Sequence, residues 1–496
     1  MATDADAGSP APTAVVVGGG ISGLLAAREL ARAGVRTTVL EAAGDWGGCV
    51  GSHVVAGLTL DSGAESFATR SSAVADLAEE LGLGPQIVPP NPGGAWVQLP
   101  EGPRELPKTG VLGIPANPWD PEVRRSLGLF GSVRASLDAL LPASVGTAAE
   151  ATSVAALVRA RMGRRVLDRL VSPVVGGVHS ADPALLDVDM VAPGLRAGVR
   201  THGSLAAAVA AQRRGAAARP AAPAPGTSGP RPQQPGLQKA GSAVAGLRGG
   251  MHTLVGALVA ELRGLDATLL SGTRADAVQR LPGGWRVTAG RARFDAERLV
   301  VAVEGPAAVA LLADTLPALA ALRPDAGPDV RLVTLVLDRP ALDAAPRGTG
   351  VLVAPQSPGI RAKALTHATA KWAWLAEQAA PGRHVVRLSY GRGDIAPDIA
   401  ANREPRSDEE LFDAALDDAS ALLGVPLSRT DVVGWDVVRW SGALPFAALG
   451  HKQRVEQVRQ LCAAERNLAV VGGWLSGNGL AAIVADTPRQ LASLLP

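Results

Sequence analysis

The stretch that decides the fold is Ala14–Leu40, AVVVGGGISGLLAARELARAGVRTTVL, which is followed by Glu41. The β-branched run at its start is typical of a strand buried on both faces. Gly18, Gly20 and Gly23 then have the spacing of the glycine fingerprint that turns a strand into a nucleotide-binding helix. The first two glycines let the backbone approach a pyrophosphate, and Gly23 lets the helix pack closely on the strand. This order predicts a dinucleotide-binding βαβ unit.

The predicted helix and the second strand supply further groups for a ligand. Ile21 and Ser22 open the helix, where unpaired backbone N–H groups and the helix dipole favour a phosphate. Gly34 is placed to end the helix, and Val35–Leu40 is predicted as the next strand. Glu41 stands close to the acidic position, about 20 residues beyond the fingerprint, that binds an adenosine ribose. A carboxylate there favours FAD or NAD over NADP.

A second glycine-rich region follows the βαβ unit. The segments Trp46–Cys49 (WGGC) and Gly57–Ala64 (GLTLDSGA) resemble the extended N-terminal FAD signature of the amine oxidase superfamily. The resemblance implies that the cofactor is FAD and that the glycine pair lies along its pyrophosphate and ribityl chain. Trp46 stands where that signature usually has a charged or small residue. The cofactor contacts that the resemblance implies here are Gly47, Gly48, Gly63, Ala64, Glu65 and Ser66.

The composition is that of a large globular enzyme. The chain has 496 residues, 47% hydrophobic and 19% charged, with a mean hydropathy of +0.17. This length predicts two or three domains of about 100–200 residues each. The net charge of +2 argues against the dense basic stripe that nucleic-acid binding requires. Two cysteines and seven histidines offer neither a disulfide framework nor a metal-ligand spacing, so we expect no metal and a reducing compartment.

The chain shows no sign of membrane insertion. Residues 1–13 (MATDADAGSPAPT) are polar and acidic, unlike a signal peptide, and residues 1–12 are predicted to be a disordered tail. No apolar run reaches about 18 residues, the length of a spanning helix. We therefore expect a cytoplasmic protein. Peripheral contact with a membrane surface through the helical region between Arg124 and Leu170 stays open.

Strand and helix signals alternate at both ends of the chain, which indicates interleaved domains. The predicted fold class is α/β: a Rossmann-like FAD-binding domain interleaved with a mixed-sheet substrate domain and a helical subdomain. The predicted boundaries are 13–88, 243–305 and 436–496 for the FAD-binding domain, 89–205 for the helical subdomain, 306–435 for the substrate sheet, and 213–242 for a flexible Pro- and Ala-rich insertion. Within them we expect a helix over Ser71–Leu83, an extended piece over Ala95–Leu99 and helices from about Glu122 to Leu170.

Two later segments complete the predicted cofactor domain. Ala275–Arg280, Gly284–Thr288 and Arg298–Val303 alternate apolar and polar residues between turns, as in a meander. In the superfamily this block contacts FAD through backbone at a residue like Val278. Near the end, a buried strand over Asn467–Val471 leads into a second glycine-rich junction. The resemblance implies that a helix N-terminus there faces the flavin ring, through Gly473, Gly479 and Leu480.

A narrower resemblance joins five blocks in order. They are Asp61–Phe67 with Arg70, Ser172–His179, Gly249–Leu262, Lys371-Trp372, and Arg439–His451. Together they resemble the bacterial FAD-dependent oxidases of protoporphyrinogen or coproporphyrinogen, most of all the actinobacterial coproporphyrinogen III oxidases. Trp440 in the last block is an expected cofactor contact. Phe446 replaces the more usual tyrosine, which indicates a packing role.

The resemblance implies chemistry driven by the flavin, with no catalytic side chain. Three two-electron hydride transfers convert the porphyrinogen to a porphyrin, and molecular oxygen reoxidises the flavin and yields hydrogen peroxide each time. Coproporphyrinogen III is the expected substrate in haem biosynthesis, because the slight positive charge suits an acidic porphyrinogen. Protoporphyrinogen IX stays an alternative. An amine oxidase is a further alternative, although Tyr390 as the single tyrosine makes an aromatic cage hard to build.

The predicted substrate contacts are Lys371 and Phe67 from the blocks, and Arg104, which follows the Trp96 strand in a region that resembles the family's substrate-binding edge. The two cations are candidates for the propionates, since cations pair with carboxylates. A solvated charge at Arg104 and a salt bridge at Lys371 are the alternatives. His451 is expected to be structural rather than catalytic. A ferrochelatase or a membrane surface is a candidate transient partner, no nucleic acid is expected, and the oligomeric state stays open.

Overall fold

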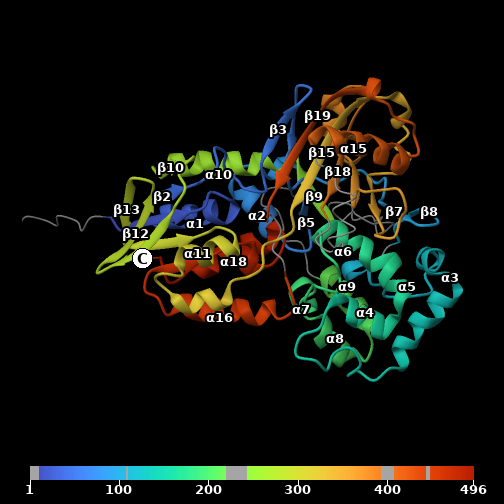
Figure 1. Ribbon diagram of the computed structural model, residues 1–496, viewed down its shortest axis with the longest axis horizontal. Coiled ribbons are helices and arrows are strands. Elements are labelled where there is room, and N and C mark those ends of the chain that lie inside the picture. The colour runs from blue at the N-terminus through green and yellow to red at the C-terminus, as the bar shows by residue number, and fades with distance from the viewer. Residues whose placement is uncertain (1–10, 108–109, 219–242, 392–406, 443–446, 496) are drawn as a thin grey trace, which may run out of the picture.

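The computed structural model describes residues 11–107, 110–218, 243–391, 407–442 and 447–495. A parallel sheet with helices on its faces forms one side of the molecule, on the left in Figure 1. A larger mixed sheet and a group of helices form the other side, where the sheet lies above the helices in that view. This arrangement confirms the predicted fold class. Most of the predicted tail, most of the predicted insertion and Phe446 lie outside these described residues.

The parallel sheet is assembled from segments far apart in the sequence. Its strands, in spatial order, are β10 (Thr268–Leu270), β2 (Arg36–Leu40), β1 (Thr13–Val17), β14 (Arg298–Val301) and β20 (Leu468–Val470). In β1, Ala14 and Val16 pack into the core on one face of the sheet, and Val15 and Val17 pack into the core on the other. The β-branched run is therefore buried on both faces, as predicted. The sheet edge at the strands' carboxyl ends brings the two glycine junctions together.

Helices from both ends of the chain cover one face of this sheet. Helix α1 (Ile21–Arg32) contacts α10 (His252–Gly264) and α18 (Leu480–Leu491). Leu24, Leu258 and Val484 from the three helices belong to one apolar core. Arg28 of α1 is 2% exposed and forms ion pairs with Glu80 and Glu261. The chain termini thus fold into one domain, which accounts for the interleaved signals in the sequence.

The predicted three-stranded meander is present, but the prediction of its third strand was wrong. The three antiparallel strands are β11 (Ala277–Leu281), β12 (Gly284–Ala289) and β13 (Ala292–Ala296). Residues 298–301 instead form β14, which lies between β1 and β20 in the parallel sheet. Leu299, Val300 and Val301 are fully buried, as a central parallel strand requires. The third strand of the meander is instead β13, which has no buried residue.

The mixed sheet has seven strands. In spatial order they are β19 (Val432–Trp440), β15 (Val330–Asp338), β18 (Arg383–Tyr390), β17 (Ala364–His367), β16 (Gly350–Val353), β7 (Trp96–Leu99) and β8 (Gly102–Glu105). β16 and β7 are parallel, whereas the other neighbours are antiparallel. β7 confirms the predicted extended piece. It extends this sheet with β8, although residues 89–205 were assigned to the helical subdomain.

The remaining described elements connect these layers. Short strands pair as β3 (Ser52–Val55) with β4 (Leu58–Asp61), and as β5 (Phe67–Ala68), β9 (Val244–Leu247) and β6 (Ile87–Val88). Further helices are α2 (Ala73–Glu80), α11 (Gly305–Leu312), α12 (Ala368–Lys371), α13 (Ala373–Ala379), α15 (Asp408–Leu423), α16 (His451–Ala463) and α17 (Gly473–Ser476). Among the residues that the structure describes, no helix is both long and apolar enough to cross a bilayer.

The helical subdomain runs from α3 to α9 and lies below the mixed sheet in Figure 1. Its elements are α3 (Pro121–Ser136), the 3-10 helix η3 (Leu137–Leu140), α4 (Val154–Met162), α5 (Arg164–Val166), a π-helical turn (Leu167–Val171), α6 (Ser172–His179), α7 (Val188–Val191), α8 (Leu195–His202) and α9 (Leu205–Ala218). The predicted helical region is thus helical but broken. Gly128 and Gly163, with φ of 69° and 90°, mark two of the breaks.

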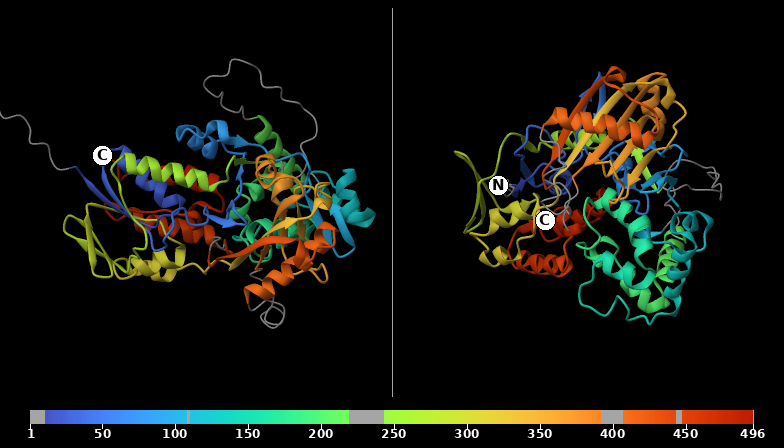
Figure 2. Two further views of the ribbon diagram at one scale, coloured as in Figure 1. Left: turned by 90° about the horizontal axis from the view of Figure 1, so that it is seen from above. Right: turned by 45° about the vertical axis from the view of Figure 1, so that its right-hand side comes forward.

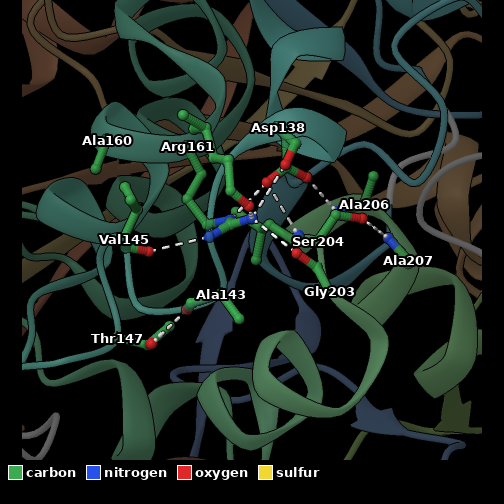
Figure 3. Close-up of polar contacts among 12 residues, drawn as sticks. Asp138, Ala143, Val145, Thr147, Ala160, Arg161, Gly203, Ser204, Ala206 and Ala207 are labelled. Carbon is green, nitrogen blue, oxygen red and sulfur yellow. Dashed lines mark hydrogen bonds and ion pairs between the residues drawn. The ribbon is translucent and has the colours of Figure 1, made fainter.

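A buried ion pair lies at the centre of the helical subdomain (Figure 3). Arg161 of α4 is 0% exposed and its guanidinium donates to a carboxylate oxygen of Asp138 at 2.5 Å. The same guanidinium donates to backbone carbonyls of Val145 and Gly203 at 3.1 and 3.0 Å. Asp138 in turn accepts from the backbone N–H of Leu205 at the start of α9. The pair therefore joins four separate chain segments.

Candidate functional site

The fingerprint loop between β1 and α1 has the conformation that its glycines predict. Gly18 has a φ of +107°, and a Cβ there would lie 2.6 Å from the carbonyl oxygen of Ala302. A Cβ on Gly23 would lie 1.8 Å from the carbonyl oxygen of Gly18. Gly20 differs, because nothing lies within 4 Å of the position of its absent side chain. Gly18 and Gly23 therefore allow tight packing of the backbone, and Gly20 leaves open space beside the loop.

The N-terminus of α1 opens onto this space. Gly20 is the N-cap residue, no side chain caps the helix, and its first turn contains no acidic residue. The backbone N–H groups of Ile21, Ser22 and Gly23 therefore form an uncapped, positively polarised helix end. A pyrophosphate is the kind of group that such an end binds.

The second glycine pair lies against the first. The backbone N–H of Gly47 donates to the carbonyl of Gly19 at 2.8 Å. Gly48 has a φ of +58°, and its absent Cβ would lie 3.4 Å from Cα of Gly20. The Trp46 ring packs over Gly19, so closely that a Cβ on Gly19 would be 2.5 Å from it. The unusual tryptophan thus fills the space beside the loop.

Glu41, at the end of β2, is bound to the fingerprint loop itself. One carboxylate oxygen accepts from the backbone N–H of Gly19 at 2.6 Å, and the other accepts from Ala43 at 2.7 Å. The side chain is half-buried. The structure therefore places this carboxylate beside the loop, where an adenosine ribose is predicted.

The Gly63–Ser66 segment runs beside the second glycine pair. Its close approach depends on Gly63, since a Cβ there would lie 2.0 Å from the carbonyl oxygen of Cys49. That carbonyl accepts from the backbone N–H of Ala64 at 2.9 Å. On the other side, Nε1 of Trp440 donates to the carbonyl of Ser62 at 2.8 Å. Trp440 therefore contacts the predicted cofactor segment from the mixed sheet.

Arg387 of β18 is a site residue that the sequence analysis missed. Its guanidinium donates to the carbonyls of Asp61 and Gly63 at 3.1 and 2.8 Å, and pairs with Glu65 at 3.0 Å. Lys371 pairs with the other Glu65 oxygen at 2.5 Å. Burial on its own raises the pKa of the Glu65 carboxyl, but the two cations outweigh it and leave the pKa lowered. No local motif marks Arg387, because its partners are more than 300 residues away in sequence.

The second glycine junction forms a matching helix end. After β20, Gly473 opens the short helix α17, and Gly479 is the N-cap of α18 with a φ of +113°. Nothing lies within 4 Å of the absent side chain of Gly479, and no side chain caps α18. Leu480 packs into the core that α1 shares. β1 and β20 belong to the same parallel sheet, so both uncapped helix ends lie at one edge of it.

The predicted substrate residues lie in three different environments. Phe67 on β5 is 3% exposed and belongs to the apolar core under α1. Arg104 is exposed on the edge strand β8. Lys371 is held by Glu65, the salt bridge that was the alternative for this residue. Their contacts with a substrate stay predictions.

Two other predicted residues are buried. Val278 of β11 is 3% exposed, and its carbonyl accepts from the hydroxyl of Thr315 at 3.1 Å. It shares a core with Leu40, next to Glu41, and its cofactor contact stays a prediction. His451 is 1% exposed, with Nε2 2.7 Å from the carbonyl oxygen of Trp474, and burial lowers its pKa. This environment suits a neutral, structural histidine.

The site offers donors and open space to a dinucleotide. The uncapped ends of α1 and α18, and the open sides of Gly20 and Gly479, provide N–H donors and space at one sheet edge. Within the described residues, no group of three or more His, Cys, Asp or Glu side chains is placed to hold a metal ion. The donor set is thus one for a phosphate-bearing organic cofactor.

Comparison with known proteins agrees with this geometry. The model of the flavin containing amine oxidoreductase family matches residues 21–486. A coproporphyrinogen III oxidase of Propionibacterium freudenreichii is 30% identical over 95% of this chain and 88% of its own length. One of Mycobacterium bovis is 31% identical, over 97% and 96%. A solved structure from Exiguobacterium sp. 255-15, named provisionally as a protoporphyrinogen oxidase, has 25% identity and a TM-score of 0.78, covering 98% of this chain and 99% of that one.

The family match begins at Ile21, within the first glycine junction, and spans the mixed sheet and the second junction. The matches confirm the predicted family and the predicted flavin cofactor, FAD. The chain is an oxidoreductase that belongs to the flavin containing amine oxidoreductases and, within them, to the family of the bacterial coproporphyrinogen III oxidases.

Proposed function

We propose that this protein oxidises coproporphyrinogen III to coproporphyrin III in haem biosynthesis. Six electrons leave the substrate in three steps, three molecules of oxygen accept them, and three molecules of hydrogen peroxide form. The observation that supports the proposal is similarity to coproporphyrinogen III oxidases over nearly the whole chain, with both glycine junctions intact. FAD, when bound, supplies the hydride acceptor for this chemistry.

In this proposal the chain's own residues bind and orient rather than react. The N–H groups at the start of α1 hold the pyrophosphate, and Glu41 holds the ribose. The uncapped end of α18 stabilises negative charge that develops near it. Arg387 and Glu65 keep the 61–66 segment in place between the two domains. Positioning of the substrate beside the cofactor is then the main catalytic device.

Propionate binding is the part of the proposal that involves charged side chains. Arg104 is exposed, and its guanidinium can form two parallel hydrogen bonds with a carboxylate. Lys371 and Arg387 share the single carboxylate of Glu65, which leaves this cluster with an excess of positive charge. An anionic substrate is favoured near such an excess. Phe67 completes the predicted set as an apolar contact.

The test is aerobic oxidation by the purified yellow holoprotein. Coproporphyrinogen III and protoporphyrinogen IX are compared by porphyrin fluorescence and by peroxide release in the same samples. We expect a larger kcat/KM for coproporphyrinogen III and about three peroxides per porphyrin. Preference for protoporphyrinogen IX would overturn the substrate, and reduction of the flavin by an amine alone would overturn the porphyrinogen assignment.

Protoporphyrinogen IX is the second candidate substrate. The observation that favours it is the Exiguobacterium structure, which covers nearly all of this chain and is named for that activity. A cytoplasmic location and transient contact with a ferrochelatase or a membrane surface complete the proposal. Pull-down with the ferrochelatase of the same organism and light scattering of the pure protein test the partner and the oligomeric state.

A further inference from the structure

A cluster of three charged side chains lies where the mixed sheet meets the FAD-binding domain. Glu65 belongs to the Gly63–Ser66 segment, Lys371 is the last residue of α12, and Arg387 lies on β18. Lys371 pairs with one Glu65 oxygen at 2.5 Å, and Arg387 pairs with the other at 3.0 Å. We call these three residues the Glu65 cluster. The cluster joins the mixed sheet, largely orange in Figure 2, to the FAD-binding domain.

The Glu65 cluster carries one unit of excess positive charge. Burial raises the pKa of the Glu65 carboxyl, but the two cations outweigh burial and lower the pKa, so the carboxyl is ionised at neutral pH. The three side chains are only 14–15% exposed. Among the residues that the structure describes, no second carboxylate pairs with Lys371 or Arg387. An unmatched charge at this depth is costly, so the cluster is suited to a negative charge that a ligand supplies.

Further contacts fix the positions of both cations. Nζ of Lys371 lies 5.0 Å from the ring centroid of the buried Trp372, a cation–π contact. The carbonyl of Lys371 accepts from the backbone N–H of Asn91 at 2.8 Å. Arg387 donates to the carbonyl of Gly63 at 2.8 Å. Charges that are held in this way need little rearrangement when a negative charge develops nearby.

A chain of backbone contacts leads from the fingerprint loop to the Glu65 cluster. The second glycine pair is attached to the loop, because the N–H of Gly47 donates to the carbonyl of Gly19. The next contact joins Cys49 to Ala64, whose N–H donates to the Cys49 carbonyl at 2.9 Å. Glu65 follows Ala64 directly. The cluster therefore lies at the far end of a path that begins at the predicted pyrophosphate site.

We propose that the Glu65 cluster faces the redox-active ring of bound FAD and raises the midpoint potential of the flavin. On reduction the ring gains two electrons and one proton, so the reduced ring carries one more negative charge than the oxidised ring. The excess positive charge of the cluster stabilises the reduced form, and its low exposure strengthens this interaction. A higher potential favours hydride transfer from the porphyrinogen. The inference rests on the flavin of the proposed function and not on which porphyrinogen is oxidised.

The experiment is a series of charge variants, in which the potential of the holoprotein is measured by equilibration with a redox dye and without porphyrinogen. K371M removes one positive charge while Arg387 still holds the Gly63–Ser66 segment. We expect about a tenfold shift towards oxidised FAD, which is a potential about 30 mV lower. E65Q removes the negative charge and should raise the potential by a similar amount. The double variant K371M/E65Q has the excess charge of the wild type, so its potential should return close to that of the wild type.

Two control variants separate charge from packing. K371R keeps the positive charge, and we expect it to keep the wild-type potential. K452M removes an exposed lysine of α16, and the potential should again be unchanged because solvent screens that charge. FAD affinity and urea midpoints are measured for every variant. A merely structural role of the cluster would make K371M/E65Q the least stable variant without restoring its potential.

The signs of the shifts decide the inference. Potentials of K371M and E65Q that move in the same direction, or do not move, would overturn it. Should K371M lose its FAD, E65Q decides alone, since it retains both cations. A higher KM of K371M for coproporphyrinogen III at an unchanged potential would also overturn it, and would assign Lys371 to a propionate. The expected shifts in a protein that oxidises no porphyrinogen would support the inference and contradict the proposed function.

Discussion

The fingerprint loop and the helical subdomain differ in the range of the contacts that hold them. In the loop, Gly18 and Gly23 are five residues apart in sequence. Their backbones approach so closely that a side chain on Gly23 would collide with the carbonyl of Gly18. In the subdomain, Arg161 holds Asp138, 23 residues away, and Gly203, 42 residues away. The first region is therefore readable as a local motif. The second depends on contacts that form only when distant segments meet.

The largest effect is expected from Arg161→Met. The change leaves the buried Asp138 carboxylate without its cation and several carbonyls without donors. We expect a loss of about 3–5 kcal/mol of unfolding free energy, seen as a lower urea midpoint. The double variant R161M/D138L is the control, because apolar residues in both places remove the unpaired charge. A midpoint for R161M equal to that of the wild type would contradict long-range control of this region.

Gly23→Ala tests the local side of the comparison. The added Cβ meets the carbonyl oxygen of Gly18, which cannot move without disturbing the loop. Overpacking of this kind costs about 1–3 kcal/mol, so we expect FAD affinity to fall about tenfold to a hundredfold. The measurement is reconstitution of the apoprotein with FAD, followed by flavin fluorescence. Gly44→Ala is the matched control, since nothing lies within 4 Å of its side-chain position.

Arg387→Met tests a contact that joins a local motif to a distant strand. The variant removes the donors to the carbonyls of Asp61 and Gly63, while Lys371 still neutralises Glu65. Hydrogen bonds from charged groups contribute about 1.5–3 kcal/mol, so we expect about tenfold weaker FAD binding. Arg383→Met changes the same residue type at the other end of β18. If both variants bind FAD equally, Arg387 does not position the 61–66 segment.

The last effect, which is absent at neutral pH, concerns His179 of α6, beside the second glycine junction. Its Nδ1 lies 3.5 Å from the side-chain nitrogen of Asn478 at the second junction, and burial lowers its pKa from 6.5 to about 4. Because the unfolded chain takes up this proton at a higher pH, stability falls as the pH drops from about 6.5 to about 4. His179→Gln should remove this part of the slope. Urea midpoints measured at several pH values, with equal slopes for both proteins, would refute it.

Much of the cofactor site could be predicted from the sequence. The positions of Gly20, Glu41 and Gly479 were predicted from the order of a strand, a glycine turn and a helix in the sequence. The structure places these residues at one edge of the parallel sheet. The third meander strand could not be assigned in this way. Both candidate segments have strand character, and only the space between β1 and β20 selects Arg298–Val301 for the parallel sheet.

The charged residues show most clearly which contacts could not be predicted from the sequence. Lys371 stood out in a local block, yet its partner Glu65 lies 306 residues away. Arg387 had no local signal at all, although it contacts the 61–66 segment at three places. The exposed apolar residues of α3, such as Leu129 and Phe130, could not be distinguished from those of a core-facing helix, since the sequence does not show which residues are buried. Exposure is a property of the folded surroundings.

By itself, the sequence determined the βαβ unit and the second glycine junction, because backbone conformation at glycine and the spacing of a strand and a helix are local properties. FAD followed from the resemblance of these segments to a known family. Only the tertiary structure decided which strand completes the parallel sheet, which cations pair with Glu65 and which face of α3 meets solvent. Burial, ion pairing and close packing join residues that are distant along the chain. Their partners are therefore known only when the chain has folded.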